Sequence, residues 1–363
     1  MDFILTAGLL IIVLSILVFV HEGGHYLAAK ACGVRVTEFM LGLPGPRIGF
    51  THKGTRFGVT AVPLGGYARV TGMEVGEVSV YLEQVLAFVY REGTVYLEDV
   101  AEAYNIQVEE ARFALDQLVS WGSIVAPLKT DEFNIYRSTA SVPSERNYKE
   151  LFGSTVYAQG EARPVADAHA LFESERSQQF RFKEFWQRAL ILLAGPAVNL
   201  LIALVCFVII YSVLGIDLQV KATGEIKHVV LDPLQAIMVG CQYIAATVLG
   251  VLGLFNPSTA GETLSQSSSL IGIAVLLKSS FEQGFINFLM LSSLISISLG
   301  IMNLIPIPPL DGGRFMVELY QAVTRKSMST KALARISTFG FALLILLFVF
   351  VTNQDIQRFI LPG

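Results

Sequence analysis

Hydrophobic residues form long runs along the chain, and the lengths of these runs predict membrane-spanning helices. The first run covers residues 3–20 without a charge, and further runs lie at about 186–214, 285–310 and 336–351. A helix needs roughly 20 apolar residues to cross the hydrocarbon core of a bilayer. The pattern therefore predicts an α-helical integral membrane protein with about four transmembrane helices.

Two apolar segments allow a second interpretation. The first run could be a cleaved signal peptide, but Asp2 is acidic where a basic region is expected, and no A-x-A cleavage site follows the run directly. Residues 232–254 are apolar enough to span, although a helix packed against the bundle would look the same. We favour a buried or interfacial helix there, because a fifth span would reverse the topology of everything that follows.

Between the first two spans, residues 38–73 alternate short β-branched runs with glycine and proline. Such punctuation is typical of β-hairpins and not of a helix. Irregular backbone is tolerated at membrane depth only where protein covers it or a wet cavity adjoins it. We therefore predict a membrane-associated β-hairpin region within residues 31–80, packed against the helices close to the functional site.

Residues 81–137 carry apolar positions at helical spacing in 81–90, 97–104 and 108–121, followed by a β-like segment to residue 136. This order predicts an inserted winged-helix-like domain. The polar residues that follow, 138–184, predict a linker that returns to the membrane.

A winged helix usually binds DNA, but the charge of this insert favours another partner. It holds ten acidic residues and only four basic ones: Arg91, Arg112, Lys129 and Arg137. The third helix, which would enter a DNA groove, carries Glu109, Glu110 and Asp116. Such a surface repels phosphates. We expect no nucleic acid here, and a regulatory module with a protein partner that the sequence leaves unknown.

Composition and charge agree with a multi-pass protein and give it an orientation. Hydrophobic residues make up 53% of the chain and charged residues only 15%. Residues 313–335 carry five basic side chains and one acidic, whereas 215–284 carry three basic and five acidic. The positive-inside rule places the first segment in the cytoplasm and the second outside. The protein is thus predicted in the cell (inner or plasma) membrane, with the insert in the cytoplasm.

This topology divides the chain into nine segments and makes the first and third spans run in the same direction. The predicted segments are 1–30 (first span), 31–80, 81–137, 138–184, 185–215 (second span), 216–284 (outside), 285–313 (third span), 314–335 (cytoplasmic loop) and 336–363 (fourth span).

The cytoplasmic end of the first span holds an H-E-x-x-H motif made of His21, Glu22 and His25. Residues four apart lie on one face of a helix, so both imidazoles can bind one metal ion. Glu22 can act as the general base toward the attacking water. A chance match is a poor explanation, because ionisable residues at membrane depth are costly and are functional candidates by default.

A catalytic zinc site needs a third protein ligand and an open position. Asp311 fits, because it follows the third span and lies at the same predicted depth as the histidines. The alternative is a turn-forming aspartate before Gly312 and Gly313. The other histidines, His52, His169 and His228, fall in segments that predict solvated side chains.

Three separated motifs resemble the site-2 protease family of intramembrane zinc metalloproteases. They are H-E-x-x-H, A-G-P-A-V-N at 194–199, and N-x-x-P-x-P-x-L-D-G at 303–312. The resemblance implies that His21, His25 and Asp311 bind Zn²⁺ and that Glu22 is the catalytic acid and base. It also implies that Asn199 and Asn303 handle substrate, although either could instead be a polar residue that bonds between helices.

By the same resemblance, residues 38–73 would be a membrane-reentrant element that presents the substrate as a strand. The substrate would be a transmembrane protein in the lipid bilayer, such as a single-pass regulator of the anti-sigma-factor type or a remnant signal peptide. Many bacterial members carry a PDZ domain between the second and third spans, but residues 217–231 are too few for one.

Two rival functions remain open. A membrane-anchored zincin acting on soluble peptides would have the same motif, but its ligands would lie in a soluble domain. A non-catalytic membrane metal-binding adaptor could act through the insert, but a structural site would not need the carboxylate of Glu22. We therefore expect an intramembrane zinc metalloendopeptidase that takes part in regulated intramembrane proteolysis.

Overall fold

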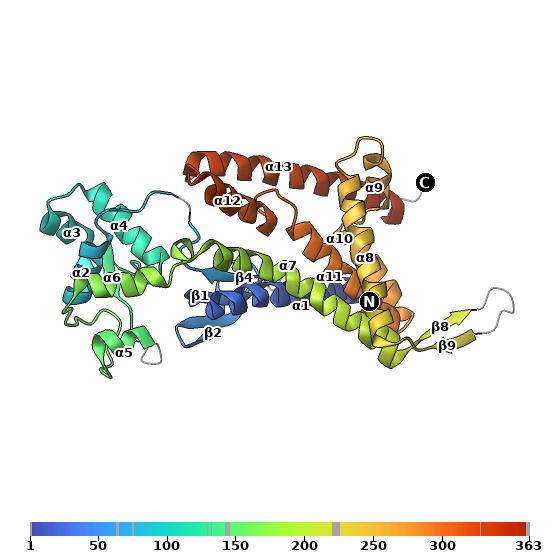
Figure 1. The fold of residues 1–363 in the computed structure, drawn as a ribbon, viewed down its shortest axis with the longest axis horizontal. Helices are drawn as coiled ribbons and strands as arrows, with labels where there is room; N and C mark the ends of the chain where they lie inside the picture. The colour runs from blue at the N-terminus through green and yellow to red at the C-terminus, as the bar shows by residue number, and fades with distance from the viewer. Residues whose placement is uncertain are drawn as a thin grey trace.

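A computed structural model describes residues 2–62, 65–74, 76–128, 130–131, 133–141, 146–219, 226–326 and 328–360. Two long helices, residues 2–31 and 185–208, run roughly along its long axis, and residues 81–184 form a separate unit near one end (Figure 1).

Five helices in the described residues are long and apolar enough to cross a membrane. They are α1 (Asp2–Ala31), α7 (Phe185–Val208), α8 (Pro233–Gly253), α11 (Phe285–Asn303) and α13 (Thr330–Asp355). A π-helical turn, Ile209–Leu214, extends α7. Four of the five match the predicted spans, and the protein is a multi-pass membrane protein.

Helix α8 occupies the segment 232–254, for which we favour a buried or interfacial helix. Only Ala236 and Gly240 of α8 are buried, and large apolar side chains such as Leu249 stay exposed. By length and composition α8 is a fifth candidate span, so the choice between a span and a buried or interfacial helix stays a prediction. It runs across α7 (Figure 1) and packs against α7 and α11.

Helices α1, α7 and α11 form the packed centre of the membrane part. A Cβ added at Gly24 of α1 would lie 2.5 Å from the carbonyl oxygen of Ala194 in α7. One at Gly300 of α11 would lie 3.1 Å from the carbonyl oxygen of Pro196. Small residues at these crossings let the backbones approach, as is usual between helices in membranes. Helix α7 is antiparallel to both others, so α1 and α11 run in the same direction.

Residues after α1 form one mixed four-stranded sheet. Strands β1 (Val36–Leu41), β2 (Arg47–His52), β3 (Thr55–Thr60) and β4 (Gly66–Val70) lie in the order β2-β3-β1-β4. The predicted hairpin exists between β2 and β3, but β1 pairs with β3 in parallel. Residues 63–64 of this stretch lie outside the described residues. Because β4 stands last in this strand order, it is an edge strand of the described sheet, and it packs against α1.

The insert contains the predicted helices and strands. Helices α2 (Leu82–Glu92), α3 (Leu97–Tyr104) and α4 (Val108–Ser120) surround an apolar core, with strands β5 (Thr94–Tyr96), β6 (Ile124–Val125) and β7 (Ile135–Ser138) beside them. The sheet order is β5-β7-β6. The three predicted helices are confirmed, while the name winged helix stays a prediction. Lys129, one of its four basic residues, lies outside the described residues.

The predicted linker, 138–184, is more ordered than its polar sequence indicates. Its described part forms α5 (Arg146–Phe152), α6 (Ala168–Ser177) and a 3-10 turn, Phe180–Phe182. Leu171 of α6 is buried in the core of the insert. The apolar residues of 138–184 are too few to show a helical or strand pattern in the sequence. In the structure they complete the hydrophobic core that residues 81–137 form.

The remaining elements connect the membrane helices. The hairpin β8 (Ile216–Gln219) and β9 (Ile226–Val229) projects beyond the far end of α7 (Figure 1). Helices α9 (Ala260–Gln266) and α10 (Leu270–Glu282) follow α8, and a π-helical turn, Ile356–Ile360, follows α13. The predicted loop 314–335 is largely helical, because α12 (Asp311–Thr324) occupies its first half.

Candidate metal centre

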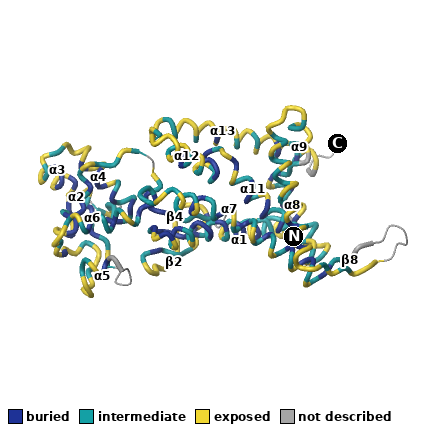
Figure 2. Tube along the Cα trace, in the orientation of Figure 1, coloured by how far each residue is buried: buried dark blue, intermediate teal, exposed yellow. Residues whose placement is uncertain are grey.

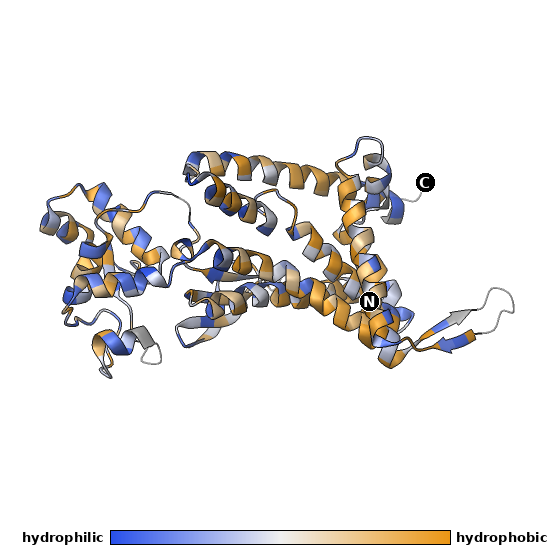
Figure 3. Ribbon diagram, in the orientation of Figure 1, coloured by the Kyte–Doolittle hydropathy of each residue, from blue (hydrophilic) through white to orange (hydrophobic). Residues whose placement is uncertain are grey.

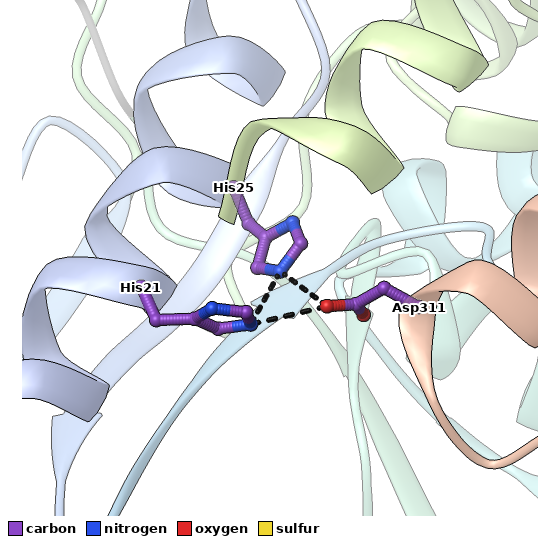
Figure 4. A group of neighbouring side chains, drawn as sticks. All are labelled: His21, His25 and Asp311. Atoms are coloured by element: carbon purple, nitrogen blue, oxygen red, sulfur yellow. Dashed lines mark hydrogen bonds and ion pairs between the residues drawn. The ribbon is translucent and has the colours of Figure 1, made fainter. Parts of the chain in front are cut away.

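His21, His25 and Asp311 converge on one point, although Asp311 is 290 residues away from His21 (Figure 4). Nε2 of His21 lies 3.0 Å from Oδ2 of Asp311, and Nε2 of His25 lies 3.3 Å from the same oxygen. The two Nε2 atoms are 3.2 Å apart. Both imidazoles are buried, and these three residues form the metal-ligand cluster found among the described residues.

The donor set fits zinc. Tetrahedral ligands about 2.0–2.1 Å from zinc stand roughly 3.3 Å from one another, which matches the observed separations. Two imidazole nitrogens and a carboxylate oxygen are common ligands of catalytic zinc, and three protein ligands leave one position open. The Nε2 atoms of His21 and His25 also face each other. If both carry lone pairs, they repel each other unless a cation or a proton lies between them.

Helix α7 fixes the orientation of both imidazoles. Nδ1 of His25 donates to the carbonyl oxygen of Ile191 at 2.7 Å. A carbonyl can only accept, so Nδ1 carries the proton and Nε2 presents its lone pair to the site. Such outer partners of ligating histidines set the tautomer and raise the affinity for the metal.

His21 has the corresponding partner in Asn199, whose side chain is fully buried. The Asn199 amide lies 3.2 Å from Nδ1 of His21, and its Oδ1 atom otherwise has no hydrogen-bond partner among the described residues. Amide oxygen and nitrogen are assigned from the bonding network. With its oxygen turned to the ring, Asn199 accepts from Nδ1 and leaves Nε2 free for a metal. This contact lies behind His21, and the predicted substrate role of Asn199 stays a prediction.

Glycine at position 195 is required by the position of His25. A Cβ there would lie 2.3 Å from Nε2 of His25. Together with the crossing at Gly24, this contact explains why the sequence A-G-P interrupts an otherwise bulky helix. In the sequence, the A-G-P-A-V-N motif served only as evidence of a family resemblance. Neither the contact of Gly195 with His25 nor the hydrogen bond from His25 to the carbonyl of Ile191 was predicted from it.

The two glycines after Asp311 place its carboxylate. Helix α11 ends at Asn303, and a proline-containing turn leads to α12, which begins with Asp311. A Cβ at Gly312 would lie 2.2 Å from the carbonyl oxygen of Leu304, and one at Gly313 would lie 2.1 Å from the nitrogen of Pro308. The turn can fold back over the start of α12 only because both positions lack side chains.

Glu22 lies between the metal ligands and the β-sheet. Its Oε2 atom accepts a hydrogen bond of 2.9 Å from the backbone N–H of Ala68 in β4. A Cβ at Gly66 would come within 3.9 Å of the Glu22 side chain, so the start of β4 also lies close to it. The carboxylate is thereby held next to an edge strand, one residue along α1 from His21.

The other predicted residues lie as follows. Asn303 is the last residue of α11, is half-buried, and makes no hydrogen bond with its side chain to the part of the chain that the structure describes. His52 is exposed at the end of β2, while His169 pairs with Glu83 and His228 with Asp217 at the surface. None of these three histidines belongs to the metal centre.

The chain matches known proteins along nearly all of its length. The model of Peptidase family M50 matches residues 9–347. Zinc metalloprotease RasP of Geobacillus kaustophilus is 26% identical over 436 residues, which covers 97% of this chain and 97% of the relative. Zinc metalloprotease RasP of Oceanobacillus iheyensis is 24% identical over 441 residues, covering 97% of this chain and 98% of the relative.

Proposed function

Since the chain belongs to peptidase family M50, whose members depend on zinc, we propose that it cleaves peptide bonds inside the transmembrane segments of other proteins. The coarser part of this function is established, because the protein is a membrane zinc metallopeptidase with zinc as its cofactor. The proposal concerns the kind of substrate and the way it is held.

One observation carries the proposal, namely the hydrogen bond between the Glu22 carboxylate and the N–H of Ala68. Strand β4 pairs with β1 on one side and is an edge of the described sheet on the other. An exposed strand edge is a template for another strand. The candidate base therefore lies where the backbone of an added strand would run.

Strand addition solves a problem that a transmembrane substrate poses. The carbonyls of a substrate helix are hydrogen-bonded along the helix, and unpaired backbone groups in lipid cost several kcal/mol each. A segment that unwinds and pairs with β4 keeps its backbone bonded. Its carbonyl would compete with Glu22 for the N–H of Ala68, so binding of the substrate would also release the carboxylate for catalysis.

Each residue of the centre then has a distinct role. His21, His25 and Asp311 would hold zinc, which when bound polarises a carbonyl and lowers the pKa of water to about 7. Glu22 would take the proton of the attacking water and return it to the leaving amine. The Ile191 carbonyl and Asn199 would keep both imidazoles oriented throughout. Asn303, half-buried and near the site, would contact the substrate.

Replacing Glu22 with Gln tests the catalytic role. The ligands stay in place, so zinc should remain near one per chain, while cleavage of a transmembrane substrate in detergent should fall by about 10²-fold or more. Asp311→Ala should lose zinc and activity together, because two protein ligands hold zinc poorly. Full cleavage by Glu22→Gln would end the proposal, and unchanged zinc in Asp311→Ala would place the third ligand elsewhere.

Replacing Ala68 with Pro tests the strand edge. Proline removes the N–H that faces away from β1, and edge strands accept proline at such positions. We expect zinc content to persist, a transmembrane substrate to be cleaved about tenfold more slowly, and a short unstructured peptide to be affected less, since one hydrogen bond is lost. Equal loss on both substrates would favour the rival function, a membrane-anchored zincin for soluble peptides.

The remaining features of the proposal concern partners and location. The substrate would be a single-pass regulator of the anti-sigma-factor type or a remnant signal peptide. The insert would lie in the cytoplasm, as the basic residues near 314–335 favour, and would contact a protein partner through its acidic surface. The adaptor alternative predicts that Glu22 is dispensable. Loss of cleavage in Glu22→Gln would therefore contradict the adaptor alternative, and an unchanged variant would support it.

A further inference from the structure

A cavity of about 400 Å³ lies between the insert and the β-sheet, and it shares no residue with the metal centre. Small-molecule sites have volumes of roughly 300–1,000 Å³. Its wall combines residues from the sheet, the insert and the segment that returns to the membrane, including Arg35, Lys53, Tyr90, Phe152, Arg163 and Glu175. Three of these side chains are cationic and one is acidic.

The acidic side chain is already neutralised. Glu175 is buried and receives two hydrogen bonds from Arg35, of 2.6 and 3.0 Å, and one from Ser123 of 2.5 Å. Burial alone would raise the pKa of Glu175, but the charge and hydrogen bonds of Arg35, the hydrogen bond from Ser123 and the charge of Arg163 lower it overall. One carboxylate thus stands against the three cations Arg35, Lys53 and Arg163 in the cavity wall, and its hydrogen bonds go to Arg35 and Ser123.

Arg163 is the unbalanced cation. Its side chain is only 3% exposed, and it forms no ion pair with any described residue. One guanidinium nitrogen, Nη2, donates to the carbonyl of Thr139, whereas Nε has no hydrogen-bond partner among the described residues. A buried charge is costly unless a counter-charge or hydrogen bonds compensate it.

Aromatic rings hold this guanidinium in place without neutralising it. Its carbon lies 4.6 Å from the centre of the Tyr90 ring, 5.2 Å from that of Tyr157 and 5.6 Å from that of Phe152. Each such contact contributes about 0.5–2 kcal/mol and orients the cation. The guanidinium therefore stays at the cavity wall in a fixed position, where the charge of Glu175 offsets it only from a distance.

Lys53 adds a further cation to the lining of the cavity. It sits in the β2–β3 turn with a φ of +45°, followed by Gly54 with a φ of +75°, and it is exposed. It makes no ion pair with the described part of the chain. Two unpaired cations from separate elements therefore line one cavity, beside apolar surface from Leu171 and Phe152.

We propose that this cavity binds a small organic anion, with a phosphate or carboxylate group against Arg163 and Lys53 and an apolar body against the rings. The anion would offset the excess of cations in the cavity wall and connect the insert to the sheet that carries β4. This site is independent of the proposed proteolysis, because none of its residues contacts the metal centre.

Calorimetric titration of the full-length, zinc-loaded protein in detergent tests the site. The probes are phenyl phosphate, benzoate and phenol, which share one ring and differ in charge. We expect at least one anion to bind with a Kd below about 1 mM and phenol to bind at least tenfold more weakly. The stronger anion shows whether phosphate or carboxylate is preferred. Absence of binding by both anions, or equal binding of phenol, would overturn the proposal.

Variants locate the bound anion. Lys53→Gln changes an exposed turn residue and should weaken anion binding about fivefold, as expected for one exposed charge contact. Arg91→Gln, an exposed cation of the insert outside the cavity, is the matched control and should stay within about twofold. Arg163→Gln should weaken binding by more than tenfold if it folds. Equal effects of Lys53→Gln and Arg91→Gln would show that binding is unspecific and would refute the site.

Discussion

The membrane helices and the insert differ most in the side chains that they leave exposed. In the insert, Leu86, Leu115 and Leu118 are fully buried. Figure 2 shows α13 as largely exposed, and Figure 3 shows the same helix as largely hydrophobic, in agreement with the exposure of Phe339 and Leu346. The membrane helices also bury polar residues such as His21 and Asn199 beside their apolar core.

This difference in exposed side chains reflects the forces that stabilise each region. The fold of the insert is stabilised by removing apolar surface from water, so it depends on how well the apolar side chains of its core pack together. Helices in lipid gain little from apolar burial and rely on close packing and on polar contacts between helices. Ser296 of α11, for example, donates to the backbone carbonyl of Asn199 at 2.9 Å. Asn199 thus takes part in a polar contact between helices through its backbone and lies beside His21 through its side chain.

The largest effect should come from adding one methyl group at position 195. In Gly195→Ala the new Cβ would meet Nε2 of His25 at 2.3 Å, so the imidazole must leave its position. We expect loss of zinc and a fall in proteolysis of at least about 10²-fold, the scale of a misplaced catalytic group. Metal analysis and a cleavage assay measure both.

Gly23→Ala is the matched control for this change. Gly23 lies within the same motif, but a Cβ there meets nothing within 4 Å, and alanine favours the helix. Zinc and activity should therefore persist in Gly23→Ala. Loss of zinc in both variants would mean that the motif tolerates no side chain for a reason other than the contact with His25.

A change at the junction of the two regions should damage the insert and spare the metal. Glu175→Gln leaves Arg35 buried without its counter-charge, which typically costs about 3–5 kcal/mol. Amide exchange in α2 and α6 should quicken accordingly, with zinc unchanged. Glu173→Gln in the same helix removes an exposed pair with Arg176 and should cost less than about 0.5 kcal/mol. Similar exchange in both variants would contradict this account.

The same pair predicts a pH dependence of definite sign. The pKa of Glu175 is lower in the folded protein than its ordinary value. A depressed folded pKa stabilises the fold above the unfolded value of about 4.3, and this stabilisation is lost as pH falls further through the folded pKa. The difference in stability between wild type and Glu175→Gln should therefore be full at pH 7 and shrink below about pH 4. A constant difference would remove Glu175 as the titrating group.

The sequence alone predicts the regions in which one strong pattern dominates. Long apolar runs gave four of the five candidate spans, and helical spacing gave α2, α3 and α4 nearly to the residue. The candidate ligands His21, His25 and Asp311 could be predicted because a motif and a topology argument agreed. Their proximity in the structure agrees with the parallel direction of α1 and α11.

Other features depend on long-range contacts that no local pattern reveals. Helix α8 is apolar enough either to span a membrane or to pack against the other helices, and no local pattern separates these possibilities. The parallel pairing of β1 with β3 joins strands that a hairpin pattern would pair differently. The order of residues 138–184 depends on Leu171 entering a core formed by another segment.

A moderate effect should follow from removing the partner of His21. Asn199→Ala leaves all three ligands in place but takes away the amide beside Nδ1, and loss of such an outer partner typically costs 10–100-fold in metal affinity or activity. We expect zinc affinity to fall about tenfold, with cleavage restored when zinc is in excess. If Asn199 instead contacts substrate, zinc affinity will be unchanged and KM will rise.

The last prediction is a negative one: the insert should not bind duplex DNA. Helix α4, which would enter a groove, carries Glu109 and Glu110 in its first turn, and its Asp116 accepts a hydrogen bond from the Tyr136 hydroxyl. Binding of DNA gains free energy mainly by releasing counterions from phosphates that basic residues neutralise, and an acidic helix cannot do this. Fluorescence anisotropy with the full-length protein in detergent should show no change at micromolar concentrations in physiological salt. Binding that weakens steeply with added salt would contradict the comparison, because the insert would then recognise phosphates despite its charge.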